Sequence, residues 1–347
     1  DIQAGFADRD FANYWLGGRA VLSGDISYLS NQPVYQQVLE STFGISPMEI
    51  RAWSYPPHYL FVAAPLGIFS YSQAYLLFML ITGGFFLMAA AAAVRKYGPE
   101  RLSGSNLIFL SVMLLPFCIL QWGAGQNGFF FGGVMLFALV WRSERPLAAG
   151  VMIALMTMKP QLGFLLPVLL LAERNFMTML WASVFSVLLM GASVALFGLA
   201  PWASYVQEVL PYQRIVMTQW EGFFLSMMPT LYASMRTFGL DSDSAFWIHM
   251  GVAIPVGLAV CIGLFRVKQT ADRAFLCVSG ALVITPYVFV YDVGCLITLI
   301  AIAYASTNLS GHDKPHPGLV LVTALIVSMP LWIMLGQPFQ VFTPILL

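Results

Sequence analysis

Acidic and aromatic side chains are concentrated near the start of the chain, in the segment 6–15 (FADRDFANYW), where two carboxylates and an arginine stand among aromatic residues. A carboxylate at the edge of an apolar region can take a proton from an attacking hydroxyl group when its environment and position suit the reaction. The aromatic residues that follow Asp10 would bury it against the rest of the protein. We therefore predict that Asp10 is a general base, and that Asp8 and Arg9 contact the substrate.

Two other interpretations of these acids follow from their spacing. The Asp8-x-Asp10 pattern also suits a divalent cation, because hard metal ions prefer carboxylate oxygens as ligands. Alternatively, one acid caps a short helix predicted over residues 11–22 and the other is solvated. His312 and His316 have the spacing of metal ligands on a helix, but their loop is rich in proline and glycine. We expect no metal site there, and we expect that no cofactor is required.

A single lysine stands at the turn of a predicted hairpin of short apolar helices, 146–158 and 160–172. This residue, Lys159, would be costly at membrane depth unless an anionic group accompanies it. A phosphate group at the level of the lipid headgroups meets that need, helped by the N-terminus of the helix that follows Pro160. The alternative is a lysine side chain that simply extends to the membrane surface.

The segment 285–292 (TPYVFVYD) interrupts a predicted span with a proline and ends on Asp292. Acidic residues within a membrane are functional by default or have a buried partner. We predict that Tyr287 and Asp292 contact the substrate. The alternative is a structural ion pair between Asp292 and Lys159 or an arginine.

Further motifs supply polar groups on the same side of the predicted membrane domain. A glycine-rich turn carries Gln126 and Asn127, whose amides suit sugar hydroxyls, although a tight turn explains its glycines equally well. The Tyr55-Pro-Pro-His58 turn offers a phenol and an imidazole, and Glu221 is a second candidate acid. We include these five residues among the predicted substrate contacts, with purely structural roles as the alternative.

These groups must be positioned by an unusually apolar chain. Hydrophobic residues make up 59% of it and charged residues 9%, whereas a soluble domain has about 25% charged residues. With a mean hydropathy of +0.79, the chain is predicted to be an all-α polytopic membrane protein. The net charge of zero excludes a basic nucleic-acid-binding surface. The four cysteines are isolated in apolar segments and lack metal or redox spacing.

Hydropathy divides the chain into four parts. We predict a first outer loop over residues 1–72, transmembrane helices over 73–198, a second outer loop over 199–244 and transmembrane helices over 245–347. Ten of the 16 basic residues fall in connections on one side of these helices, which the positive-inside rule assigns to the cytoplasm. The two outer loops and the candidate site residues therefore face the opposite side.

Smaller elements are expected within these parts. The first outer loop should contain a helix over 33–43 and a re-entrant apolar segment over 60–69, and the second an amphipathic helix over 224–238. The candidate spans are 73–95, 104–120, 127–141, 146–158, 160–172, 176–198, 245–265, 274–290, 292–306 and 317–335. Because the chain begins at Asp1 without a methionine or a signal-like segment, we expect one more helix upstream.

The order of these motifs resembles that of glycosyltransferase family 87. The shared features are an Asp-Phe-x-x-Tyr-Trp opening at Asp10, a Trp-Ser-Tyr-Pro-Pro turn that ends at Pro57, a Gly-Gln-Asn turn and a late Pro-Tyr…Tyr-Asp element. The family is polyprenyl-phosphate-sugar-dependent and includes mycobacterial phosphatidylinositol-mannoside mannosyltransferases. Where their pattern has a late histidine, this chain has Tyr291 and Asp292, so the resemblance does not identify the sugar or the acceptor.

The resemblance implies a GT-C membrane fold and an inverting transfer of a sugar from a polyprenyl phosphate. Asp10 matches the family's general base, in the first outer loop. The leaving phosphate would be held by Lys159, a helix N-terminus and Arg9 or Arg214. The implied partners are the lipid-linked donor, a glycolipid or glycan acceptor and membrane lipids. We expect a monomer in the bacterial cytoplasmic membrane, with its site facing the periplasm.

Other classes of function remain open. A transporter or flippase of lipid-linked sugars would also suit broken helices and intramembrane charges such as Lys159 and Asp292. Its expected signature is inverted repeats with polar residues on both faces, and the sequence has no clear internal repeat. A structural membrane subunit is a third class, but it leaves the acids of the outer loops unexplained.

Overall fold

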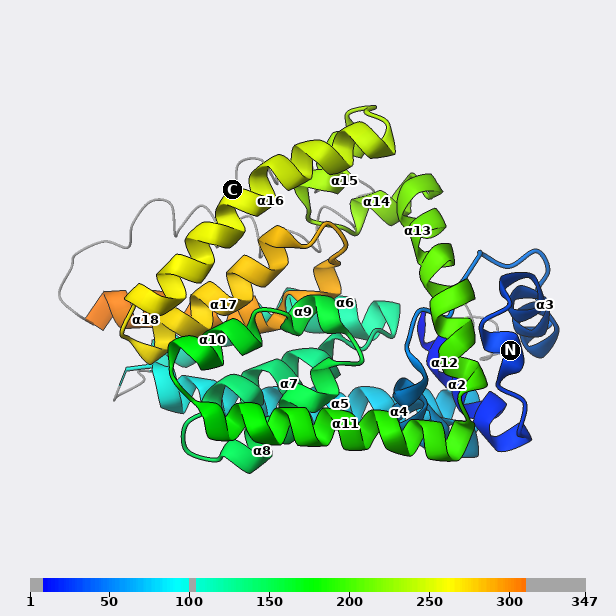
Figure 1. Cartoon of the computed structure of the whole chain (residues 1–347), viewed down its shortest axis with the longest axis horizontal. Helices are drawn as coiled ribbons and strands as arrows, with labels where there is room; N and C mark the ends of the chain where they lie inside the picture. The colour runs from blue at the N-terminus through cyan, green and yellow to red at the C-terminus, as the bar shows by residue number, and fades with distance from the viewer. Residues whose placement is uncertain (1–8, 100–103, 310–347) are drawn as a thin grey trace.

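The computed structural model describes residues 9–99 and 104–309, and these residues form helices joined by loops, with no strand among them (Figure 1). The α-helices are α2 (Phe11–Ser23), α3 (Gln32–Phe43), α4 (Leu60–Ala63), α5 (Tyr71–Tyr97), α6 (Gly104–Ala124), α7 (Gly128–Trp141), α8 (Pro146–Met156), α9 (Pro160–Gly163), α10 (Leu166–Ala172), α11 (Phe176–Phe197), α12 (Ala200–Ser204), α13 (Leu210–Gln219), α14 (Phe223–Ser226), α15 (Leu231–Thr237), α16 (Ser242–Arg266), α17 (Thr270–Ile284) and α18 (Gly294–Leu309). The short turns are η1 (Ser27–Leu29), η2 (Pro57–Tyr59), η3 (Ala64–Ile68) and η5 (Val290–Asp292), which are 3-10 helices, and η4 (Tyr205–Val209), a π-helix. The prediction of an all-helical chain is confirmed for this part of the protein.

Three of the described helices, α5, α11 and α16, are long and apolar enough to cross a membrane. Most of their exposed side chains are apolar, as in Leu196 of α11, which is 71% exposed, and a large exposed apolar face of this kind is suited to lipid. The other apolar helices are shorter. The expected number of about ten spans is therefore not confirmed, and the span expected over 317–335 lies outside the described residues.

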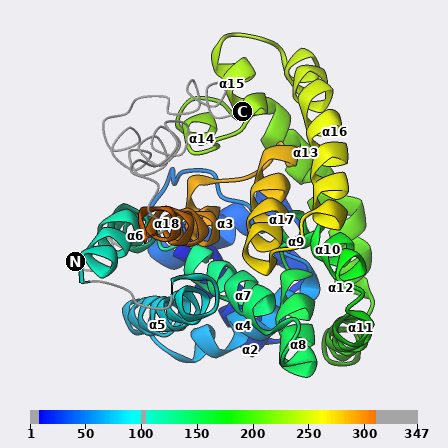
Figure 2. The same cartoon turned by 90° about the vertical axis from the view of Figure 1, so that its left-hand side faces the viewer.

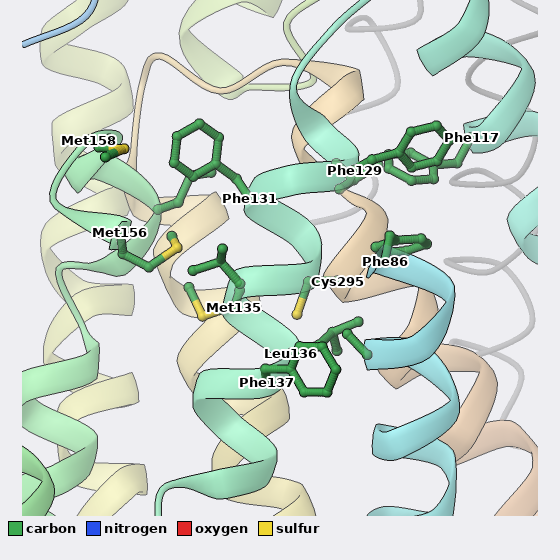
Figure 3. Close-up of a cluster of buried hydrophobic side chains, with 14 of the residues drawn as sticks. Phe86, Phe117, Phe129, Phe131, Met135, Leu136, Phe137, Met156, Met158 and Cys295 are labelled. Carbon is green, nitrogen blue, oxygen red and sulfur yellow. The ribbon is translucent and has the colours of Figure 1, made fainter. Parts of the chain in front are cut away.

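Helix α7 is the centre of the apolar core. It contacts α5, α8 and α18, and Figure 2 shows it between α5 and α8. Phe86 of α5, Phe117 of α6 and Cys295 of α18 pack beside Phe129 and Met135 of α7 (Figure 3). A helix that is apolar on all sides must be buried on all sides, and α7 is. The residues that precede its first turn are consequently held in a fixed position.

Helix α2 packs against η3 by direct backbone contact. A Cβ atom added to Gly18 would lie 2.3 Å from the carbonyl oxygen of Ala63, and one added to Gly67 would lie 2.5 Å from the carbonyl oxygen of Gly18. Only glycine permits so close an approach. The contact fixes α2, and therefore Asp10 at its N-terminus, at the end of the molecule where α3, α12 and α13 also lie (Figure 1).

At the opposite end of α7, the buried guanidinium of Arg142 joins several helices. Its Nε and Nη2 atoms donate to the carboxylate of Glu173 at 2.8 and 2.9 Å, and Nη1 donates to the hydroxyl of Tyr97 at 2.6 Å. Nη2 also donates to the carbonyl oxygen of Thr270 at 2.9 Å. The ends of α5, α7, α10 and α17 are thereby tied to one side chain.

The helix boundaries bear on two local expectations, and they confirm the first. The helix predicted over 33–43 is α3, and it ends at Gly44, whose φ of 66° is in the left-handed region that favours glycine. The apolar segment expected over 60–69 forms the two short helices α4 and η3, and its re-entrant position in a membrane stays a prediction.

Two expectations about helices are wrong, and proline explains both. The amphipathic helix predicted over 224–238 is two short helices, α14 and α15, separated by a loop that contains Pro229. The span predicted over 274–290 ends as a helix at Ile284, because Pro286 has no N–H group and disfavours helical backbone in the residue before it. Residues 285–289 instead form a loop that contributes to the site.

Candidate active site

One end of the helix assembly encloses a cavity of about 480 Å³. It is lined by Asp10, Asn13, Tyr14, Glu49, Ile50, Arg51, Ala52, Ser54, Tyr55, Ile119, Leu120, Gly123, Ala124, Gln126, Val216, Trp220, Phe223, Phe224, Met227, Tyr287, Phe289, Val290 and Tyr291. Segments from both predicted outer loops and from the 285–292 loop therefore meet at one place, as the clustering of their polar residues in the sequence indicated.

Asp10 lies on the wall of this cavity and is held by two donors. Arg51 donates from Nη1 to Oδ1 at 2.7 Å, and Gln126 donates from Nε2 to Oδ2. The Asp10 side chain is 34% exposed. Although Asp10 occupies the N-cap position of α2, its side chain makes no capping hydrogen bond. Its carboxylate is therefore oriented by side chains of the cavity wall and does not cap the helix.

A chain of hydrogen bonds extends from Asp10 into the protein. The Tyr14 hydroxyl donates to Oε1 of Gln126 at 2.7 Å, which turns the amide nitrogen of Gln126 toward Asp10. Burial and the neighbouring tyrosines raise the pKa of Tyr14 well above its usual value, so this hydroxyl keeps its proton. The Tyr55 hydroxyl lies 3.2 Å from that of Tyr14 and accepts from Nδ2 of Asn127 at 2.8 Å. The predicted residues Tyr55, Gln126 and Asn127 thus belong to one network with Asp10.

The turn that carries these amides is fixed by its own contacts. Gln121 donates to the carbonyl oxygen of Tyr291 at 2.7 Å and accepts from the backbone N–H of Gly128 at 3.1 Å. A Cβ atom at Gly128 would lie 1.8 Å from the same carbonyl oxygen, so this position requires glycine. The turn and the 285–292 loop are therefore in direct contact, which places Gln126 and Tyr291 on the same cavity.

Arg51 is a site residue that our sequence analysis missed. It lies in the extended segment before η2 and is 4% exposed. Its backbone N–H donates to Gln36 of α3 at 3.2 Å, so α3 holds this segment in place. The available signal was modest: Arg51 is one of the few basic residues that fall outside the loops in which most of the positive charges gather.

The cavity has a polar end and an apolar end. The polar end carries Asp10, Asn13, Glu49, Arg51 and Gln126, and Arg51 Nη2 lies 3.7 Å from the Glu49 carboxylate. The apolar wall is formed by Ile119 and Leu120 of α6, Val216 of α13, Trp220, Phe223, Phe224, Met227, Phe289 and Val290. A ligand that fits both ends must itself be amphiphilic, with a polar head and a hydrocarbon portion.

Lys159 and Asp292 form a buried ion pair behind this cavity. Lys159 Nζ donates to Asp292 Oδ1 at 2.5 Å, and the two side chains are 8% and 1% exposed. The backbone N–H of Phe289 donates to Asp292 Oδ2 at 3.3 Å. The structure thus contains the ion pair that was one of the alternatives from sequence. It anchors the helical hairpin to the loop that lines the cavity, while contact of either residue with a substrate stays a prediction.

Arg9 and His58 are engaged by the protein. Arg9 donates to the carbonyl oxygen of Trp122 at 2.7 Å and to the hydroxyl of Tyr75. His58 is 1% exposed and stacks on Trp202 with 5.5 Å between ring centroids. Burial lowers the pKa of His58 to about 4, so its ring is neutral at pH 7 and offers no positive charge to a phosphate. Neither side chain lines the cavity.

The other predicted contacts fall in different places. Tyr287 lines the cavity and donates from its hydroxyl to Oε1 of Gln213 at 3.3 Å. The Glu221 side chain is 74% exposed and accepts from Arg236 at 3.0 Å, away from the cavity lining. Asp8, His312 and His316 lie outside the described residues.

A comparison with protein families decides the class of protein. The model of glycosyltransferase family 87 matches residues 53–290, more than half of the chain. The chain belongs to glycosyltransferase family 87. No curated protein and no solved structure matches it.

The family 87 match covers part of the site. It includes Tyr55, Gln126, Asn127 and Tyr287, whereas Asp10 and Arg51 precede the matched region. The placement of these last two residues therefore rests on the geometry of the chain itself. Membership shows that this helical protein is a glycosyltransferase, and its apolar helices associate it with a membrane.

Most of the polar side chains that line the cavity of this family 87 protein carry nitrogen or hydroxyl groups as possible ligands. Within residues 9–99 and 104–309, no three His, Cys, Asp or Glu side chains gather in a cluster that could hold a metal ion. The cation site considered for Asp8 and Asp10 depends on a residue that is not described, so it stays an open hypothesis.

Proposed function

We propose that this family 87 protein transfers a sugar from a polyprenyl-phosphate sugar to a hydroxyl group of a glycolipid or glycan, on the periplasmic face of the bacterial cytoplasmic membrane. The observation that carries the proposal is the Asp10 carboxylate on the wall of an amphiphilic cavity, oriented by Arg51 and Gln126. The polar end would take the sugar and phosphate of the donor. The apolar wall would take the first part of its hydrocarbon chain.

In the proposed reaction the acceptor oxygen attacks the anomeric carbon of the donor. The bond between that carbon and the phosphate oxygen breaks, and its electron pair leaves with the phosphate. Asp10 takes the proton of the attacking hydroxyl, as general bases do when they lie within hydrogen-bond reach of it. One displacement of this kind inverts the configuration at the anomeric carbon.

Arg51 is our candidate for the group that binds the donor phosphate. Among the described residues that line the cavity, it is the one with a permanent positive charge. Guanidinium groups match the geometry of phosphate oxygens, and their hydrogen bonds to phosphate are charge-assisted. Lys159, which we predicted for this role from sequence, is paired with Asp292 and does not line the cavity.

The proposal is tested by a transfer assay in membranes with a panel of polyprenyl-phosphate sugars. Asp10→Asn keeps the size of the side chain and its contact with Arg51, but removes the base. We expect transfer to fall by about 100-fold or more, in the range that general bases contribute. Asp243→Asn, at an exposed acid in the first turn of α16, is the matched control and should retain transfer.

Two results would count against the proposal. Transfer by Asp10→Asn at the wild-type rate would remove Asp10 from the mechanism. Movement of lipid-linked sugars across proteoliposomes, without transfer from any donor, would favour a flippase instead.

A further inference from the structure

A second cavity, of about 240 Å³, lies beside the candidate active site. Its walls come from the loop after α2, from the segment 53–57 and from α12 and η4. Asp10 is not among its lining residues, whereas Tyr55 lines both cavities. At Tyr55 a single side chain therefore separates the two spaces.

The chemistry of the second cavity differs from that of the first. None of the described residues that line it is a lysine or an arginine, so it is poorly suited to a phosphate. It offers the aromatic rings of Trp53 and Tyr205 and the hydroxyl groups of Ser27 and Ser204. The side chain of Ser27 donates to Oδ1 of Asp25 at 2.6 Å, and such bonds lower the pKa of Asp25, which is thus a carboxylate at neutral pH.

This set of groups matches a neutral ligand with many hydroxyls. A carboxylate and serine hydroxyls accept and donate hydrogen bonds, and aromatic rings cover the apolar faces of a bound molecule. A sugar ring has both kinds of surface. A free phosphate or the phosphate of the donor would meet Asp25 as a like charge.

One helix forms a wall of both cavities. Val209 and Val216 are buried on the same face of η4 and α13, about two turns apart, and line the second and the first cavity respectively. Gln213 lies between them. It donates to Oγ of Ser54 at 2.7 Å and accepts from Tyr287 at 3.3 Å, so it joins this helix to both other walls where the cavities meet.

The helix has an irregular turn at the second cavity. Leu210 donates its backbone N–H to the carbonyl oxygen of Tyr205, one residue further back than in an α-helix. Pro211 follows and has no N–H group to continue the regular pattern. Single π turns of this kind are frequent at functional sites. Here the turn contributes Tyr205 and Val209 to the cavity wall.

We propose that the second cavity binds a sugar residue of the acceptor, while the donor occupies the cavity that contains Asp10. The acceptor would extend past Tyr55 to present one hydroxyl to Asp10. This inference rests on the proposed function and adds to it the position and chemical class of the acceptor's binding site. It also gives Gln213, Ser54 and Tyr55 a role as the partition between the two substrates.

The test fills the second cavity with a tryptophan side chain introduced on helix α12. Ser204→Trp places a ring in the cavity, and Ala203→Trp places the same ring on the exposed neighbouring position as a matched control. Initial rates are measured in membranes with the best wild-type polyprenyl-phosphate sugar as donor and a panel of n-octyl glycosides as acceptors. We expect Ser204→Trp to raise the KM for the glycoside by about 10-fold or more, equivalent to about 1.4 kcal/mol, with the donor KM unchanged.

A second variant guards against a folding effect of the tryptophan. Asp25→Asn leaves the cavity open and removes one charge from an exposed site, and it should also raise the KM for the glycoside. Equal KM values for the glycoside in wild type, Ser204→Trp and Asp25→Asn would overturn the inference while leaving the proposed function intact. A wild-type protein that transfers no sugar would instead refute the proposed function, and the inference with it.

Discussion

At the scale of single residues, the site is a chain of hydrogen bonds with Asp10 at its cavity end. Arg51 contacts one carboxylate oxygen and Gln126 the other, while Tyr14 determines which way the Gln126 amide faces. Each side chain fixes the orientation of the next. A base held in this way before the acceptor arrives avoids the entropic cost of being positioned during the reaction.

Arg51 should act in two ways, on Asp10 and on the donor. We expect Arg51→Met to lower kcat/KM for the donor by about 10- to 100-fold, because hydrogen bonds to charged groups contribute about 1.5–3 kcal/mol. Arg51→Lys should restore part of the loss, since it returns the charge without the planar guanidinium. The measurement is the rate of transfer in membranes at varied donor concentration.

Arg19→Met serves as the control for the loss of one outer arginine, because Arg19 is exposed on α2 and does not line the cavity. Full activity in Arg51→Met would exclude both roles. An equal loss in Arg51→Met and Arg51→Lys would show that the shape of the guanidinium matters and that its charge alone is not sufficient.

The sequence revealed some of these residues and concealed others for a physical reason. Asp10, Tyr55, Gln126 and Asn127 were singled out because polar residues are rare in an apolar chain. The structure joins them in one hydrogen-bonded network, while their contact with a substrate stays a prediction. Arg51 was missed because its partner is 41 positions away, and only the folded chain brings the two together. Pairing of Lys159 with Asp292, across 133 positions, was one of the alternatives from sequence, because each charge needed a buried partner.

At the scale of elements, the two ends of the helices are built differently. One end carries the cavities, whereas the other end is tied together by Arg142, whose side chain contacts α5, α10 and α17. A buried ion pair that loses one member leaves an uncompensated charge, which costs about 3–5 kcal/mol. The Arg142 cluster should therefore affect stability more than catalysis.

We expect Arg142→Met to lower the free energy of unfolding by about 3–5 kcal/mol. In the single variant Glu173 keeps only the ion pair with Arg273, whose Nη1 lies 3.8 Å from Oε1. The double variant Arg142→Met/Glu173→Met removes this buried carboxylate and should be destabilised less. Thermal unfolding of the detergent-solubilised protein is the measurement, with transfer below the unfolding temperature as a second readout.

The exposed pair of Lys96 and Glu144 provides the control at the same end of the molecule. Their side chains are 31% and 61% exposed, and removing an exposed pair changes stability by about 0–1 kcal/mol. If Arg142→Met were no more destabilising than Lys96→Met, the cluster would not hold the helices together.

Helix positions were predictable from the sequence where nearby residues determine them, through glycine, proline and hydropathy. Glycine correctly marked the end of α3, and hydropathy located α5, α11 and α16. The end of α17 was placed six residues too late because the apolar run continues past Pro286, which breaks the helix but not the hydropathy. The close contact between α2 and η3 was not predictable, because it depends on two glycines far apart in sequence.

At the scale of the whole molecule, the proposal depends on which side of the membrane the cavities face. Both cavities lie at the end of the molecule formed by α2, α3, α12 and α13 (Figure 1). The Arg142 cluster and the loops richest in basic residues lie toward the other end of α7. By the positive-inside rule we expect the basic end to face the cytoplasm, and we therefore predict that the cavities open to the periplasm.

This orientation predicts a difference in labelling between two introduced cysteines. Asp243→Cys, at an exposed position at the start of α16, should react with a membrane-impermeant maleimide in intact spheroplasts. Glu144→Cys, in the loop after α7, should react only after the membrane is opened, because the reagent cannot cross the bilayer. Wild type is the background control, since Cys277 and Cys295 are buried and Cys118 and Cys261 lie within apolar helices. The reverse pattern would place Asp10 in the cytoplasm, where a donor presented on the periplasmic leaflet could not reach it, and the proposed reaction would then require a donor on the cytoplasmic leaflet.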